Sequence, residues 1–390
     1  MFSVDKEYII KIRRAIHEYP ETDFDLPKTV ALVKGELEKM DIPYTEKYGK
    51  SSLVGYINPD KTNFTIAIRA DMDALNMTEK NDVPYKSKVE GKMHACGHDA
   101  HAAMLLGAAK YLKSIEKDLN CRVKLLFQPS EEGAESGAMM MVKNGVMDDV
   151  DVIIGQHIES GLNSGTLAVC KGYSQASSRN FKIEIFGRPA HCTTPQLGVD
   201  ALAVAVRVYS DLQFMLNREI SPMTQVVCSV GSLNAGKMQN NIAEYAVMLG
   251  TVRAYDMQVD EFVYKRMQDI VRSACEQVGA TYKISAPMKC VSVYNNPYLS
   301  DLITSAMEKV VGKENVGIMK PKLGAEDFSR YAEIKPGVLF RLGIINAEKG
   351  ITAGAHEENF DIDEDALELG AKTFVQFVLD NMKGIDKSKL

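Results

Sequence analysis

The stretch RNFKIEIFG, residues 179–187, alternates polar and apolar side chains along its length. Such alternation is typical of a strand with one buried face and one face in water. By contrast, the preceding stretch VDVIIG, residues 150–155, is almost continuously apolar, as expected for a strand buried in a parallel sheet. The sequence therefore predicts that the chain passes from one architecture to another shortly before residue 179.

Upstream of this point, predicted strands alternate with predicted helices. The strands are SSLVGYI (51–57), FTIAIRA (64–70) and RVKLLFQ (122–128), and the helices are HAAMLLGAAKYLKSI (101–115) and SGAMMMVKNG (136–145). This alternation favours a largely parallel sheet with helices on both faces. Helix–strand alternation resumes near Pro297 and continues to the C-terminus.

Downstream of RNFKIEIFG the element types follow a different order. A helix (198–217), two strands (224–233 and 242–255), a long amphipathic helix (258–279) and a last strand (281–286) follow in turn. The resulting β-α-β-β-α-β order is ferredoxin-like. We therefore predict an α/β fold, in which a mainly parallel-sheet domain (1–175 and 289–390) is interrupted by an inserted ferredoxin-like α+β domain (176–288).

The bulk composition excludes several classes of protein. The 390 residues carry a formal net charge of −6, which argues against a nucleic-acid binder. Apolar runs such as ALAVAVRV (201–208) are too short to cross a bilayer, and the first residues do not form a signal peptide. Seven scattered cysteines then indicate reduced thiols in a cytoplasmic protein.

Polar side chains follow four strands of the predicted α/β domain. Asp71 and Asp73 follow FTIAI, Glu131 and Glu132 follow VKLLF, His157 follows VDVIIG, and His356 lies in a loop after GVLFRLG. Open α/β sheets bind ligands at the carboxyl ends of their strands. Because these histidines and carboxylates follow four strands of one predicted sheet, the sequence predicts a functional site at this edge of the sheet.

The stretch HACGHDAH, residues 94–101, contains the densest group of candidate metal ligands. Cys96 and His98 are two apart on a glycine-containing turn, and thiolate with imidazole favours zinc or a similar transition metal. A buried thiol beside a surface histidine is the alternative. By spacing alone His94 and His101 could equally be ligands, and Asp99 could cap the following helix.

Glu131 and Glu132 form the second signal. Adjacent carboxylates repel each other unless they point apart or share a cation. One could bind metal while the other accepts a proton from water, or both could be a solvated pair at the start of a helix.

Taken together, these motifs resemble a known family. RADMDAL, GKMHACGHDAH, FQPSEEGAESGA, QHI, GVDAL, LGTVRAYD, GAEDFS and AHEENFDIDEDAL occur in the order seen in the amidohydrolase branch of the aminoacylase and carboxypeptidase-like dinuclear metallopeptidases. This branch includes hippurate hydrolases, N-acyl-amino-acid deacylases and auxin-conjugate hydrolases. The resemblance covers nearly the whole chain.

The resemblance implies two divalent metal ions, manganese or zinc, with cobalt or nickel as alternatives. The implied ligands are Cys96, His98, Glu132, His157 and His356. Cys96 would bridge the two ions, and Glu131 would be the general base. Asp71 would be a further catalytic carboxylate, and Asp73 would support the ligands.

The resemblance also assigns roles in the inserted domain, which often acts as a lid and in dimerisation. His191 and Asn240 would contact the substrate, and the protein would be a homodimer or homotetramer. Gln196 and Ala243 depart from the family pattern here, which bears on substrate choice.

The implied reaction is hydrolysis of the amide bond of N-acyl amino acids. A dipeptidase or exopeptidase with the same site is the first alternative. A metal-binding protein without catalysis is the second, although it would have no use for a spare base at Glu131.

Overall fold

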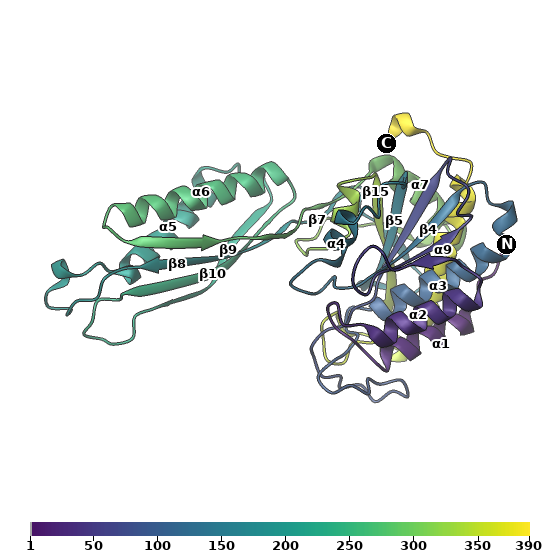
Figure 1. Cartoon of the computed structure of the whole chain (residues 1–390), viewed down its shortest axis with the longest axis horizontal. Helices are drawn as coiled ribbons and strands as arrows, with labels where there is room; N and C mark the ends of the chain where they lie inside the picture. Colours follow the sequence, from purple (N-terminus) through teal and green to yellow (C-terminus); the bar gives the residue numbers. More distant parts are fainter. Residues whose placement is uncertain (1) are drawn as a thin grey trace. The chain divides into compact units, whose positions relative to one another are not determined.

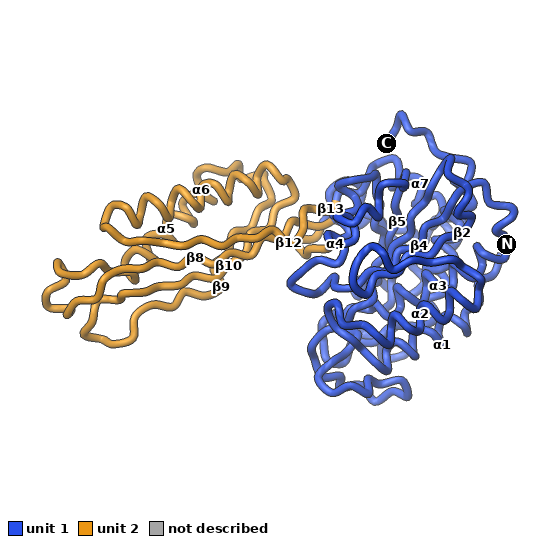
Figure 2. The backbone as a smooth tube through the Cα atoms, in the orientation of Figure 1, with its two compact units in different colours: residues 1–174, 294–321, 327–390 blue, residues 175–293, 322–326 orange. Residues whose placement is uncertain are grey.

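A computed structural model describes residues 2–390, which form two compact units (Figure 2). Of the described residues, unit 1 comprises 2–174, 294–321 and 327–390, and unit 2 comprises 175–293 and 322–326. Each unit has a hydrophobic core of its own. No helix within residues 2–390 has the length and apolarity needed to span a membrane.

Unit 1 is built on an eight-stranded sheet with the order β1-β2-β4-β3-β5-β15-β6-β14. The strands are β1 (Tyr44–Thr45), β2 (Leu53–Ile57), β3 (Thr65–Asp71), β4 (Arg122–Gln128), β5 (Val152–Asn163), β6 (Leu167–Val169), β14 (Val316–Ile318) and β15 (Gly337–Ile345). The central pairs β4–β3, β3–β5 and β5–β15 are parallel. All residues of β3 and β4 are buried. The apolar runs in their sequences predict this for the apolar side chains but not for charged ones such as Arg69 and Lys124.

The helices of unit 1 place apolar faces on this core. They are α1 (Lys6–His17), α2 (Pro27–Lys39), α3 (His98–Ser114), α4 (Gly137–Lys143), α7 (Pro297–Val311), α8 (Ser329–Ala332) and α9 (Leu367–Asn381) (Figure 1). Helix α3 packs against both α1 and α9, and accordingly most of its side chains are buried. Helix α1 begins after Asp5, whose carboxylate caps it by accepting from the backbone N–H of Tyr8.

Unit 2 has the predicted ferredoxin-like order. Its elements are β8 (Ser178–Phe186), α5 (Ala201–Arg218), β9 (Val226–Ala235), β10 (Tyr245–Ala254), α6 (Met257–Glu276) and β11 (Thr281–Ser285). The antiparallel sheet runs β11-β8-β10-β9, and a short strand β12 (Met288–Cys290) also pairs with β8. Figure 1 shows α5 and α6 side by side on one face of this sheet. Strands β7 (Gly172–Gln175) and β13 (Val293–Asn295) form a separate pair where the chain passes between the units.

The α/β fold with a ferredoxin-like insertion is thus confirmed, but two local predictions are wrong. His157 does not end its strand, because β5 continues to Asn163 and pairs with β15 along this length, with one shift of register after Glu159. Nor does Asp99 cap α3: the helix begins at His98 after Gly97, without a side-chain cap. The Asp99 carboxylate instead accepts hydrogen bonds from Arg13 and His17, both of which are buried.

Candidate metal centre

The turn before α3 brings Cys96 and His98 to one point. Gly97 adopts the left-handed conformation, with φ of 81°. A Cβ at this position would lie 2.6 Å from Cγ1 of Ile158 on β5, so only glycine fits between the turn and the strand. The turn therefore lies directly against the strand that carries His157.

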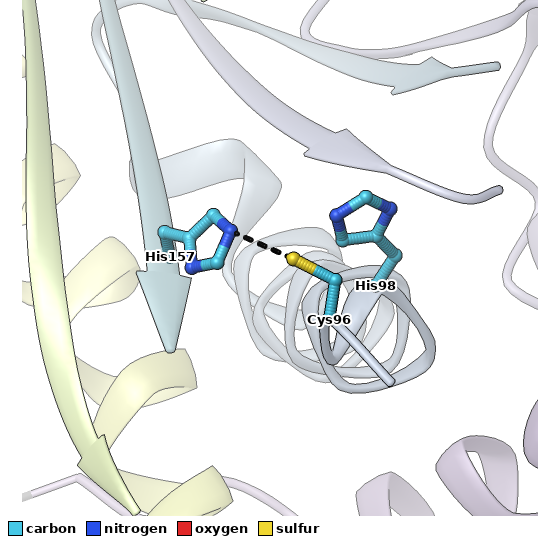
Figure 3. Close-up of side chains that lie close together, drawn as sticks. All are labelled: Cys96, His98 and His157. Atoms are coloured by element: carbon cyan, nitrogen blue, oxygen red, sulfur yellow. Dashed lines mark hydrogen bonds between the residues drawn. The ribbon is translucent and has the colours of Figure 1, made fainter. Parts of the chain in front are cut away.

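Cys96, His98 and His157 form the first group of donor atoms. One ligand atom from each lies within 4.8 Å of the others, and the Cys96 sulfur is 3.5 Å from Nε2 of His157. Figure 3 shows the Cys96 and His157 side chains facing each other, with His98 beside them at the start of α3. Thiol and imidazole groups at this separation suit a transition metal.

Cys96, Glu132 and His356 form a second group of donor atoms, which also lie within 4.8 Å of one another. Nε2 of His356 lies 3.1 Å from Oε1 of Glu132. The backbone N–H of His356 donates to the carbonyl of Ala95, which ties the distant loop to the Cys96 turn. Cys96 is common to both groups, so its sulfur stands where one atom could bridge two cations.

The tautomers of His98 and His157 leave one nitrogen of each free for a cation. Nδ1 of His98 is 2.8 Å from the carbonyl oxygen of Asp73, and Nδ1 of His157 is 2.6 Å from that of Ile158. A carbonyl oxygen can only accept, so both Nδ1 atoms carry the proton. Nε2 of His98 is buried without a hydrogen-bond partner, as expected for a nitrogen that binds a metal ion.

Two buried aspartates hold this arrangement in place. The Asp73 carboxylate accepts from the backbone N–H groups of Glu131 (2.9 Å) and Glu132 (3.0 Å). The Asp71 carboxylate pairs with Arg69 at 2.6 Å and lies 3.6 Å from Nε2 of His98. Neither aspartate belongs to either group that contains Cys96, although Asp71 lies in a separate group with His98 and His101. Their contacts with Arg69 and with the backbone of Glu131 and Glu132 favour supporting roles.

Glu131 lies beside the donors and is almost entirely buried. Its carboxylate belongs to a third group, with His98 and Glu132. Its Oε1 atom lies 3.4 Å from the backbone N–H of Asp327, which donates to it. Glu131 and Glu132 also lie outside helix α4, which begins at Gly137, so they are not a pair of acids in a first helical turn.

The charges in the centre depend on one another. Burial alone would lower the pKa of His98, but the Asp71 carboxylate raises it well above its ordinary value, so a cation that binds Nε2 would displace a proton from that nitrogen. Burial acts to raise the pKa of Glu132, yet the hydrogen bond with His356 lowers it to about 2. Burial raises the pKa of the Cys96 thiol, so a bound cation would be needed to stabilise the thiolate.

His191 and Asn240 lie close together within unit 2. Nδ1 of His191 is 2.7 Å from the hydroxyl of Thr193, and the backbone N–H of Cys192 donates to the carbonyl of Asn240 at 2.9 Å. The His191 ring is exposed. A role of these two residues in substrate binding stays a prediction.

A buried network of hydrogen bonds lies behind the centre and was not predicted from the sequence. Arg69 donates to Gln128 (2.7 Å) and to Asp327 (2.9 Å), and Gln128 also donates to Asp327. The signal was an arginine inside the apolar strand FTIAIRA, where a charge must find buried partners. The network links Asp71 to the residue whose N–H contacts Glu131.

Comparison with known proteins identifies the family of this chain. Residues 67–380 match the peptidase family M20/M25/M40. Thermostable carboxypeptidase 1 of Saccharolobus solfataricus is 39% identical over 371 residues, covering 94% of this chain and 93% of that protein. N-acetyl-L-cysteine deacetylase of Bacillus subtilis is 34% identical, covering 93% and 85%.

A solved structure extends the similarity to the fold. The YXEP protein of Bacillus subtilis, described as a dinuclear metal binding peptidase from the M20 family, superimposes with a TM-score of 0.85 at 29% identity. The match covers 97% of this chain and 99% of that one. The chain therefore belongs to the peptidase family M20/M25/M40 and is a metal-dependent hydrolase of that family.

Proposed function

We propose that this protein hydrolyses the amide bond of N-acyl amino acids, such as N-acetyl or N-benzoyl derivatives. The observation that carries the proposal is the pair of donor groups that share Cys96, with Glu131 as an additional buried carboxylate beside them. A centre that only stored metal would need the donors but would have no use for Glu131. The similarity to an N-acetyl-L-cysteine deacetylase supports an N-acyl amino acid as substrate.

Two cations would be held by five residues of unit 1. These are Cys96, His98, Glu132, His157 and His356. When bound, the cations supply Lewis acidity that polarises the amide carbonyl and lowers the pKa of water. The mixture of one thiol, three imidazoles and one carboxylate favours zinc by the softness of its donors, and the family resemblance adds manganese as the other candidate.

Glu131 would transfer the proton in this reaction. Its carboxylate takes a proton from the attacking water and returns it to the nitrogen of the leaving amine. The backbone N–H of Asp327 donates to this carboxylate, and the Asp73 carboxylate accepts from the backbone N–H of Glu131. These two contacts hold Glu131 in place. Asp71 keeps its charge because Arg69 lowers its pKa well below the ordinary value against the opposing effect of burial.

A substrate panel on metal-defined protein tests the proposal. N-acetyl, N-benzoyl and dipeptide forms of several amino acids are incubated with the protein after loading with manganese, zinc or cobalt. We expect release of amine from the acylated amino acids, with dipeptides cleaved more slowly. Failure to release amine from any acylated amino acid with both ions bound would overturn the proposal.

A dipeptidase or exopeptidase activity is the second candidate. It is favoured by the 39% identity to a protein named as a carboxypeptidase. The same residues would perform the reaction, since the carbonyl chemistry is identical. Faster cleavage of dipeptides than of acylated amino acids in the same panel would select this alternative.

A further inference from the structure

His101 uses both of its ring nitrogens in hydrogen bonds. It lies in the first turn of α3 and is 2% exposed. Its Nδ1 atom lies 2.5 Å from Oδ1 of Asp71 at the end of β3. Its Nε2 atom lies 3.0 Å from the backbone nitrogen of Ile158 on β5. The ring therefore joins a helix to two strands of the central sheet.

These two partners determine the protonation of the ring. The N–H of Ile158 can only donate, so Nε2 of His101 accepts and carries no proton. Nδ1 then carries the proton and donates it in a hydrogen bond to the Asp71 carboxylate. His101 does lie within 4.8 Å of Asp71 and His98 in a group of possible ligands. Since both of its nitrogens are engaged in hydrogen bonds, we do not assign it as a metal ligand, an alternative that its spacing in HACGHDAH left open.

The hydrogen bonds continue from Ile158 to His157. The carbonyl of Ile158 accepts from Nδ1 of His157 at 2.6 Å, while its N–H is held by His101. This second contact fixes the tautomer that leaves Nε2 of His157 facing the Cys96 sulfur. Hydrogen bonds thus connect the Asp71 carboxylate, through His101 and the backbone of Ile158, to the ring of His157. The Nε2 atom of that ring is a candidate metal ligand.

We propose that His101 is a positioning residue, which holds His157 in its ligating tautomer and orientation through Ile158. The inference rests on the metal centre of the proposed function and adds a residue that acts on that centre without binding metal. Groups that orient metal-binding histidines typically change affinity by about 10–100-fold when removed.

Two substitutions separate the two hydrogen bonds of His101. In His101→Gln the side-chain oxygen reaches the position of Nε2 and can accept from Ile158, but the bond to Asp71 is lost. In His101→Asn the side-chain amide reaches the position of Nδ1 and can donate to Asp71, but the bond to Ile158 is lost. His94 supplies a control, because it is equally buried but belongs to no group of possible metal ligands in residues 2–390 and makes no hydrogen bond through its ring.

The affinities for Mn²⁺ and Zn²⁺ are measured by titration calorimetry on full-length protein, for wild type, both His101 variants and His94→Asn. We expect His101→Asn to bind one of the two ions about 10–100-fold more weakly. His101→Gln should retain the affinity of wild type. With Co²⁺ bound, the visible absorption bands should shift in His101→Asn only.

Three results would overturn the inference. They are equal losses in the two His101 variants, no loss in either, and a loss in His94→Asn as large as that in His101→Asn. These results are separate from the substrate panel. Wild-type protein that binds two ions but cleaves no acylated amino acid would overturn the proposed function alone.

Discussion

The Asp73 carboxylate accepts a hydrogen bond from the backbone N–H of Glu131 at 2.9 Å. Its other oxygen accepts from the next residue, Glu132, so one side chain fixes both carboxylates of the loop. The carbonyl of Asp73 also accepts from His98. Asp73 therefore connects the proposed base to two proposed ligands, although it belongs to neither group.

Replacing Asp73 should weaken the whole centre. Asp73→Ala leaves two N–H groups without an acceptor, and we expect metal affinity to fall by about 10–100-fold. Asp73→Asn keeps one acceptor oxygen, so its metal affinity should lie between the affinities of the alanine variant and wild type. Metal titration gives the order of the three proteins. An alanine variant with the affinity of wild type would show that Asp73 does not organise the centre.

Removing the shared sulfur should lower the metal content. Cys96→Ala deletes the one donor common to both groups, so purified protein should hold fewer ions per chain than wild type. Cys121→Ala is the matched control, because Cys121 is also a buried free thiol but belongs to no group of candidate ligands in residues 2–390. The measurement is elemental analysis after dialysis. Equal metal content in Cys96→Ala and the control would remove Cys96 from the ligands.

Arg69 should stabilise unit 1 through its buried carboxylate partners. Arg69→Met leaves Asp71 and Asp327 buried without their cation, and the free energy of unfolding should fall by about 3–5 kcal/mol. Arg14→Met removes an arginine that is 45% exposed and pairs with Glu364, and should cost at most about 1 kcal/mol. Urea unfolding of both variants provides the comparison. Equal losses of unfolding free energy in the two variants would contradict the stabilising role assigned to Arg69.

Asp149 should contribute a pH-dependent share of stability through the fully buried Lys124. Partial burial acts to raise the pKa of Asp149, but the hydrogen bond from Lys124 lowers it below its ordinary value of 3.8. The ionised carboxylate therefore stabilises the folded state above that pH, and this contribution is lost as the pH falls through the lowered pKa.

The variant Asp149→Asn isolates this contribution. The difference in unfolding free energy between wild type and variant should be largest above about pH 4 and shrink at lower pH. Asp118→Asn, at an exposed aspartate, should show no such dependence. A difference that stays constant with pH would contradict the assigned role.

The sequence predicted much of the fold because its patterns are local. Period-two alternation identified β8, and apolar runs identified β3 and β4. The end of β5 was placed too early, since the apolar run stops near His157, whereas pairing with β15 extends the strand to Asn163.

The candidate site was only partly accessible from the sequence. Spacing suggested Cys96, His98 and the Glu131–Glu132 pair, and left His101 open as a ligand. Its supporting role depends on the hydrogen bond from Ile158, more than fifty positions away along the chain. Likewise, the position of Asp99 at the start of a helix suggested a cap, but its carboxylate accepts hydrogen bonds from Arg13 and His17, which are distant in the sequence.

The most direct test of the central claim is the variant Glu131→Gln. It is assayed for bound ions per chain and for turnover of the best substrate in the panel. The amide keeps the shape of the side chain but cannot take a proton, so we expect wild-type metal content and turnover lowered by about 100- to 10,000-fold. Turnover within tenfold of wild type, with metal bound, would contradict the account.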